Sequence, residues 1–136
     1  GKMTATCGTC HATLGRAARL AAPGRPSASP TMTGRMRDHH WAVEVMSLGL
    51  QSPSDTLWNE GAKAIATSAV VKPAEASAAQ PADLAEAEAA FRALGVKAQK
   101  ALDPFARGAL YGELLASCGS CHALHGRIFG PIVPLQ

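Results

Sequence analysis

Residues 103–122, with the sequence DPFARGALYGELLASCGSCH, combine a helix start, an apolar face and a cysteine motif in one uninterrupted stretch. Asp103 followed by Pro104 is the usual pattern of an N-cap and a first helical residue. The residues that we expect on the inward face of this helix are Phe105, Leu110, Leu114 and Leu115. The stretch therefore predicts a helix from Pro104 to about Ala123, with the cysteine motif in its last turns.

The cysteine motif, Cys-x-x-Cys-His, occurs at residues 118–122 and again at residues 7–11. This spacing is the attachment sequence of c-type haem. Two thiols three positions apart lie on one side of a helical turn, so they can add to the two vinyl groups of one porphyrin, and the adjacent histidine can ligate the iron. The expected attachment residues and proximal ligands are Cys7, Cys10, His11, Cys118, Cys121 and His122. The chain is thus expected to hold two covalently bound haem c groups, which use all four of its cysteines.

Other uses of the same cysteines stay open at this point. The two C-x-x-C pairs could share one structural zinc ion, or the four cysteines could form disulfides. A dithiol redox pair usually accompanies a strand-rich βαβ pattern, which the sequence lacks. We favour haem because a histidine directly follows the second cysteine in both copies.

Apolar periodicity and capping signals predict three further helices before the last one. Their expected spans are residues 33–50 with Thr33 as N-cap, a second helix from Ser54 to before Pro73, and residues 83–102. No segment alternates between apolar and polar residues for long, so no sheet is expected.

These elements predict an all-α fold in a single domain over residues 1–136. Amphipathic helices joined by short connections pack as an antiparallel four-helix bundle, here over residues 33–125. Residues 1–32 hold the first motif and a stretch rich in Pro, Gly and Ser, so we expect an irregular N-terminal haem-binding segment. Trp41 and Trp58 are expected in the core or at a haem edge.

Three segments of the sequence resemble a known family. They are residues 36–42 (MRDHHWA), 49–58 (GLQSPSDTLW) and 111–116 (YGELLA). Small bacterial dihaem c-type cytochromes carry Met-x-x-His-x-Trp-Ala, then Gly-Leu-x-x-Pro-Ser-Asp-x-x-Trp, and then Tyr-Gly-Glu-Leu-Leu-Ala before the second haem motif. The resemblance implies a relative of the four-helix-bundle cytochrome c′ class, in which the haem motif ends the last helix. The additional N-terminal motif departs from that class.

The group on the far side of each iron decides between an electron carrier and a ligand-binding site. Met36 and His39 lie one turn apart on the expected inward face of residues 33–50, so both are candidate iron ligands. In one assignment His39 ligates the N-terminal haem and Met36 the haem of the last helix. His40 lies about 100° from His39 around the helix axis and is an alternative iron ligand to either His39 or Met36. A purely structural role in the core is the competing interpretation.

Composition and charge exclude two classes of function. The net charge is +3, the basic residues are scattered and no aromatic residues interleave with them, so nucleic-acid binding is not expected. No apolar run approaches the roughly 20 residues of a membrane span. Haem attachment takes place outside the cytoplasm, so we expect a removed secretory signal and a periplasmic location.

The sequence therefore predicts a periplasmic one-electron transfer protein, with redox proteins as its partners and no catalytic residues. An enzyme such as a peroxidase is not expected, because the chain is short and no distal acid–base pair is evident. The alternative is a gas-binding or sensor cytochrome with one five-coordinate haem. Bundles of the class that it resembles often dimerise through their first two helices, so a homodimer is a further expectation.

Overall fold

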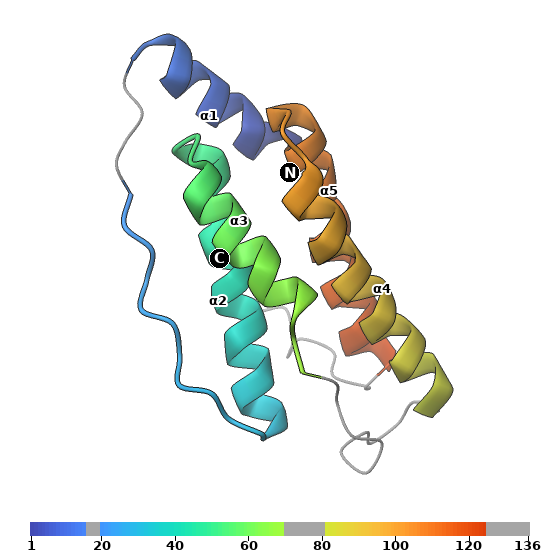
Figure 1. The fold of residues 1–136 in the computed structure, drawn as a ribbon. Helices are drawn as coiled ribbons and strands as arrows, with labels where there is room; N and C mark the ends of the chain where they lie inside the picture. Colours follow the sequence, from blue (N-terminus) through green and yellow to red (C-terminus); the bar gives the residue numbers. More distant parts are fainter. Residues whose placement is uncertain (16–19, 70–80, 125–136) are drawn as a thin grey trace, which may run out of the picture.

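The computed structural model describes residues 1–15, 20–69 and 81–124 (Figure 1). The five helices of this part of the chain are α1 (Lys2–Thr13), α2 (Met32–Gln51), α3 (Asp55–Ala66), α4 (Pro81–Lys100) and α5 (Pro104–Leu124). No strand occurs among these residues, which confirms the all-α prediction. None of the five helices is long and apolar enough to cross a membrane.

The N-terminal segment differs from its prediction, because residues 2–13 form helix α1 rather than irregular structure. The helix has no side-chain N-cap and consists mostly of small residues, so its sequence gives little reason for it. Its stability comes from packing: Ala5 is fully buried, and Gly8 lies against the backbone carbonyl of Leu50 in α2. Residues 20–31 are irregular, as predicted.

Two predicted helix starts are confirmed by their capping hydrogen bonds. The Ser54 hydroxyl accepts from the backbone N–H of Leu57 at 3.3 Å, and the Asp103 carboxylate accepts from the backbone N–H of Ala106 at 2.7 Å. Each bond satisfies an N–H group that the helix cannot pair internally. Helices α3 and α5 therefore begin where the sequence indicates.

Boundaries of three helices differ from their predictions. Helix α4 spans Pro81–Lys100, two residues earlier at each end than the predicted 83–102. The N-cap of α2 is Thr31 and not Thr33, since its hydroxyl accepts from the backbone N–H of Gly34 at 3.1 Å. Helix α3 ends at Ala66, where Thr and Ser follow, two residue types whose hydroxyls compete for backbone hydrogen bonds. The predicted stop before Pro73 lies outside the described residues.

The helices pack in chain order: α2 against α3, α3 against α4 and α4 against α5, while α1 lies across α2 and α5 at one end (Figure 1). The large side chains that are fully buried between them are Val45, Met46, Trp58, Ile65 and Leu114. The indole Nε1–H of Trp58 donates to the carbonyl of Ala98 in α4 at 2.8 Å. Trp41 is also buried, so both tryptophans lie in the core.

The inward face predicted for α5 is only partly correct. Leu114 is fully buried and Leu110 half-buried, but Phe105 and Leu115 are 56% and 46% exposed. Leu115 is rotated by about 100° from Leu114, which turns it away from the face that packs on the other helices. Phe105 lies in the first turn, nine residues before Leu114 and therefore about 180° from it around the helix, so it points away from the packed face.

Candidate cofactor sites

The thiols of the first motif lie on an open face of α1. Cys7 and Cys10 are exposed and free, one turn apart on the same side of the helix. Met3 and Leu14 continue this stripe at helical spacing and are 84% and 66% exposed. A flat apolar group bonded to both thiols would cover side chains that otherwise leave apolar surface in water.

The imidazole of His11 is held by the end of α2. Its Nδ1–H donates to the backbone carbonyl of Gln51 at 3.0 Å, and the side chain is half-buried. With the proton on Nδ1, the lone pair of the neutral ring is on Nε2, which is the form in which histidine ligates a metal. The first motif therefore fits a c-type haem: two accessible thiols and an imidazole already oriented by a backbone partner.

The second motif lies in the last turns of α5, as predicted. Cys118, Cys121 and His122 are half-buried, and Cys118 packs against the apolar core. Burial raises the pKa of both thiols. The charge of Cys121 raises the pKa of Cys118 further, and the charge of Glu88 raises the pKa of Cys121 further. The second motif is therefore less exposed than the first, and a porphyrin bonded to it would be better shielded from water.

The two motifs are far apart. Helix α1 crosses α5 at Gly108, where an added Cβ would lie 3.0 Å from the Cβ of Ala5. Cys118 is ten residues further along α5, about 15 Å at the usual helical rise. All four cysteines are free, and no group of three or more His, Cys, Asp or Glu side chains within residues 1–15, 20–69 and 81–124 is arranged to hold a metal ion. The geometry therefore gives no support to a zinc ion or a disulfide shared between the motifs.

His39 of α2, a predicted iron ligand, packs beside an aromatic ring of α4. Its ring centroid lies 4.8 Å from that of Phe91, with the planes tilted by 43°. The Nε2 atom is inaccessible to water and forms no hydrogen bond with any described residue. Burial lowers the pKa of His39 below its ordinary value. The negative charge of Asp38 raises this pKa and the positive charge of Arg35 lowers it, but burial has the largest effect. The ring therefore favours its neutral form.

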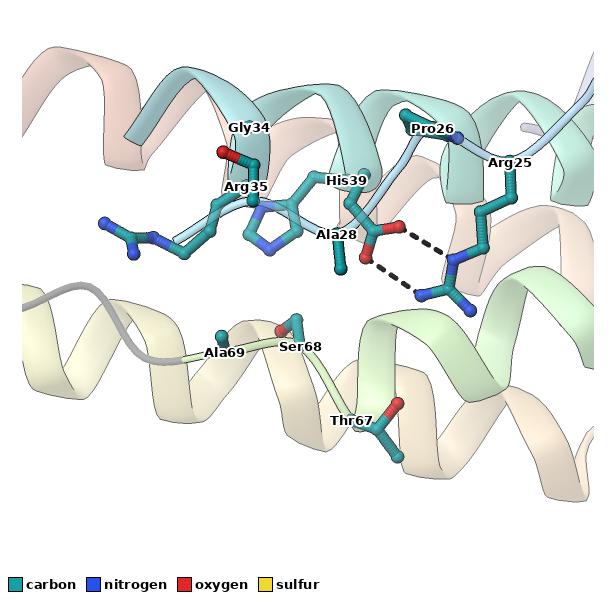
Figure 2. Close-up of a pocket in the computed structure, with 11 residues that line it drawn as sticks. Arg25, Pro26, Ala28, Gly34, Arg35, His39, Thr67, Ser68 and Ala69 are labelled. Carbon is teal, nitrogen blue, oxygen red and sulfur yellow. Dashed lines mark hydrogen bonds and ion pairs between the residues drawn. The ribbon is translucent and has the colours of Figure 1, made fainter. Parts of the chain in front are cut away.

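A pocket of about 340 Å³ adjoins His39 between α2, residues 25–29 and residues 67–69. Figure 2 shows the ring of His39 in this space and Arg25 at one side of it. The Arg25 guanidinium donates two hydrogen bonds to the carboxylate of Asp38, at 2.8 and 3.0 Å. This ion pair keeps the irregular segment against α2 beside His39.

The other two ligand candidates on α2 have different surroundings. Met36 is half-buried, one turn before His39 on the same side of the helix. His40 is exposed. The structure thus brings Met36 and His39 together on one inward face, and leaves His40 turned toward solvent.

Arg107 is a buried cation that the sequence analysis did not single out. Only 8% of its side chain is exposed. It donates to the carboxylate of Asp55 at 2.7 Å and to the carbonyl of Ala101 at 2.8 Å, and it lies 5.4 Å from the ring centroid of Trp58. It therefore ties α5 to α3. Its spacing along the chain does not distinguish it from the other arginines, so no sequence signal pointed to this role.

Comparison with known proteins adds no assignment. No protein-family model, curated protein or solved structure matches this chain. Its function is therefore argued from the two motifs and from the geometry of their surroundings.

Proposed function

We propose that this chain is a dihaem c-type cytochrome that transfers single electrons between redox proteins in the periplasm and is not an enzyme. The observation that carries the proposal is the pair of C-x-x-C-H motifs, each on a helix with both thiols free. The hydrogen bond of His11 adds support, because it leaves Nε2 available for iron. The sequence resemblance to small bacterial dihaem cytochromes points the same way.

Attachment of each haem requires only the residues of one motif. The sulfur of each motif cysteine bonds to one carbon of a vinyl group and the thiol hydrogen goes to the other carbon, so no electrons are gained or lost. His11 and His122 would ligate the irons, with His39 and Met36 as candidates for the opposite side. When bound, each haem supplies one reversible electron, and the chain anchors, orients and covers it.

We also propose that α2 to α5 form an antiparallel four-helix bundle of the cytochrome c′ kind, with α1 across one end. The connections at residues 52–54 and 101–103 support this arrangement, because three residues are too few for neighbouring helices to run in the same direction. The packing of helices in chain order is a second support.

Haem content is the first test. The whole chain, produced in a bacterium that attaches c-type haem, should gain the mass of two haems and show the pyridine-haemochrome spectrum of thioether-linked haem. The paired variants Cys7→Ser with Cys10→Ser, and Cys118→Ser with Cys121→Ser, should each keep one haem. A chain that weighs only what its amino acids weigh would refute the proposal.

Spin state separates electron transfer from ligand binding. We expect the reduced protein to be low-spin and unchanged by carbon monoxide, because each iron would have a protein ligand on both sides. A redox titration should show two reversible one-electron steps. A reduced haem that binds carbon monoxide or nitric oxide would support the alternative function instead, a gas-binding or sensor cytochrome with one five-coordinate haem.

A further inference from the structure

The buried Nε2 atom of His39 has no hydrogen-bond partner in the part of the chain that the structure describes. The atom is also sealed from water. Phe91 covers the ring but offers it no polar atom. Buried polar atoms are nearly always paired, so an unpaired one needs an explanation, and a metal bond to this nitrogen would supply it.

The second motif lies at the same end of the helix assembly as His39. Helix α4 connects them: Phe91 contacts His39, and Glu88, one turn earlier, acts electrostatically on Cys121. Cys118 packs against the core cluster to which Phe91 belongs. Figure 1 shows the start of α2 and the end of α5 at the same end of the molecule.

The first motif lies toward the other end of α2. His11 contacts Gln51, which is twelve residues after His39 and therefore about 18 Å away along the helix axis. Two histidines that share one iron lie only a few ångströms apart. This placement argues against the assignment of His39 to the N-terminal haem.

We propose that His39 is the distal ligand of the haem attached at Cys118 and Cys121, with His122 on its other side. The inference rests on the proposed function and assigns two histidines to the interior haem. Met36 then packs beside this haem without ligating it. A haem with histidine on both sides has a lower reduction potential than one with histidine and methionine. The second haem should therefore have a lower potential than Met36 ligation would give it.

A protein that carries only the second haem gives the direct test. Cys7→Ser with Cys10→Ser removes the first attachment at two exposed positions. In this background His39→Ala should convert the reduced haem from low-spin to high-spin, and carbon monoxide binding should rise from none to one per chain. His40→Ala, at the exposed neighbouring position, is the matched control and should leave the haem low-spin. A low-spin haem in His39→Ala, or a high-spin haem in Met36→Leu, would overturn the inference.

His39→Met tests the same assignment without leaving the iron open. The haem should stay low-spin, its reduction potential should rise, and the ferric protein should gain the charge-transfer band of thioether ligation. An unchanged potential and no new band would contradict the assignment.

Histidine NMR of the dihaem protein provides a readout that does not depend on the cysteine variants. In His39→Ala the hyperfine-shifted ring signals of His122 should move into the high-spin range, while those of His11 should stay. The reverse pattern would overturn the inference. Haem content separates the two proposals: no covalent haem refutes the proposed function, whereas two haems with an unchanged second haem refute the ligand assignment alone.

Discussion

The first and second C-x-x-C-H motifs have nearly the same residues but very different surroundings. The first lies on α1, a helix of 12 residues, and exposes both thiols. The second lies in the last turns of α5, a helix of 21 residues, where both thiols are half-buried and Cys118 packs against the core. The pattern therefore fixes which atoms are available for haem, whereas the carrier helix decides how much water reaches them. Haems on these motifs would differ in solvent exposure and hence in reduction potential.

Removal of the second attachment should have the largest effect. Cys118→Ser with Cys121→Ser eliminates a haem that would pack against the core, so the free energy of unfolding should fall by about 3–5 kcal/mol, as for a large core side chain. The matched change at Cys7 and Cys10 should cost less, about 1–2 kcal/mol, because the haem that it removes would cover only the exposed side chains of α1. Denaturant unfolding of the two variants measures the difference, and equal losses would remove the distinction between an outer and an inner site.

Loss of the arginine side chain near each site should have the second largest effect on stability. Arg107 is buried near the first motif, where Arg107→Ala leaves the carbonyl of Ala101 without its donor, and this should cost about 2–3 kcal/mol. Arg25, near His39, has a side chain that is 52% exposed, so Arg25→Ala should cost about 1 kcal/mol or less. Thermal and denaturant unfolding of both variants tests this order, and a larger loss for Arg25→Ala would reverse it.

The glycines inside the motifs form a closely matched pair. A Cβ at Gly8 would collide with the backbone carbonyl of Leu50, whereas a Cβ at Gly119 would meet nothing within 4 Å. Gly8→Ala should therefore push α1 from α2 at a cost of about 1–3 kcal/mol. Gly119→Ala should stabilise α5 by roughly 0.5–1 kcal/mol, since alanine is the better helix former. Denaturant unfolding should show that the free energy of unfolding falls in Gly8→Ala and rises in Gly119→Ala. A fall in both variants would contradict the difference between the two glycines.

Thiol reactivity in the haem-free chain gives the smallest effect. The raised pKa values of Cys118 and Cys121 mean less thiolate at neutral pH, so alkylation of these thiols should be slower than at exposed Cys7 and Cys10. Their rates should still be rising at a pH above the ordinary thiol range, because the thiolate forms only there. Peptide mass spectrometry after timed alkylation measures all four rates, and faster labelling of the α5 thiols would contradict the difference in burial.

Much of the fold followed from local signals in the sequence. Ser54 and Asp103 predicted the starts of α3 and α5 because capping is a property of a few adjacent residues. Helix α1 was missed because its stability comes from contacts of Ala5 and Gly8 with other helices, which no local pattern encodes. The exposure of Phe105 was missed although helical spacing indicated it, because Phe105 and Leu114 are nine residues apart and lie on opposite sides of α5.

The candidate sites divide in a similar way. The motif cysteines and histidines were identified from spacing alone, because attachment chemistry needs residues that are adjacent in sequence. The Nε2 atom of His39, which has no hydrogen-bond partner among the described residues, and the buried position of Arg107 depend on contacts between helices that are distant in sequence, so only the folded chain reveals them. Burial of the second motif belongs to the same group.

The hydrogen bond from His11 to Gln51 has one more consequence. Gln51 is the last residue of α2, and the final carbonyls of a helix have no partner within it. This one hydrogen bond thus satisfies a carbonyl at the end of α2 and orients an imidazole that lies 40 residues away in sequence. In the proposed cytochrome, fraying of that terminus would free the ring and alter its electron donation to iron. Voltammetry of the N-terminal haem would then double as a measurement of local unfolding.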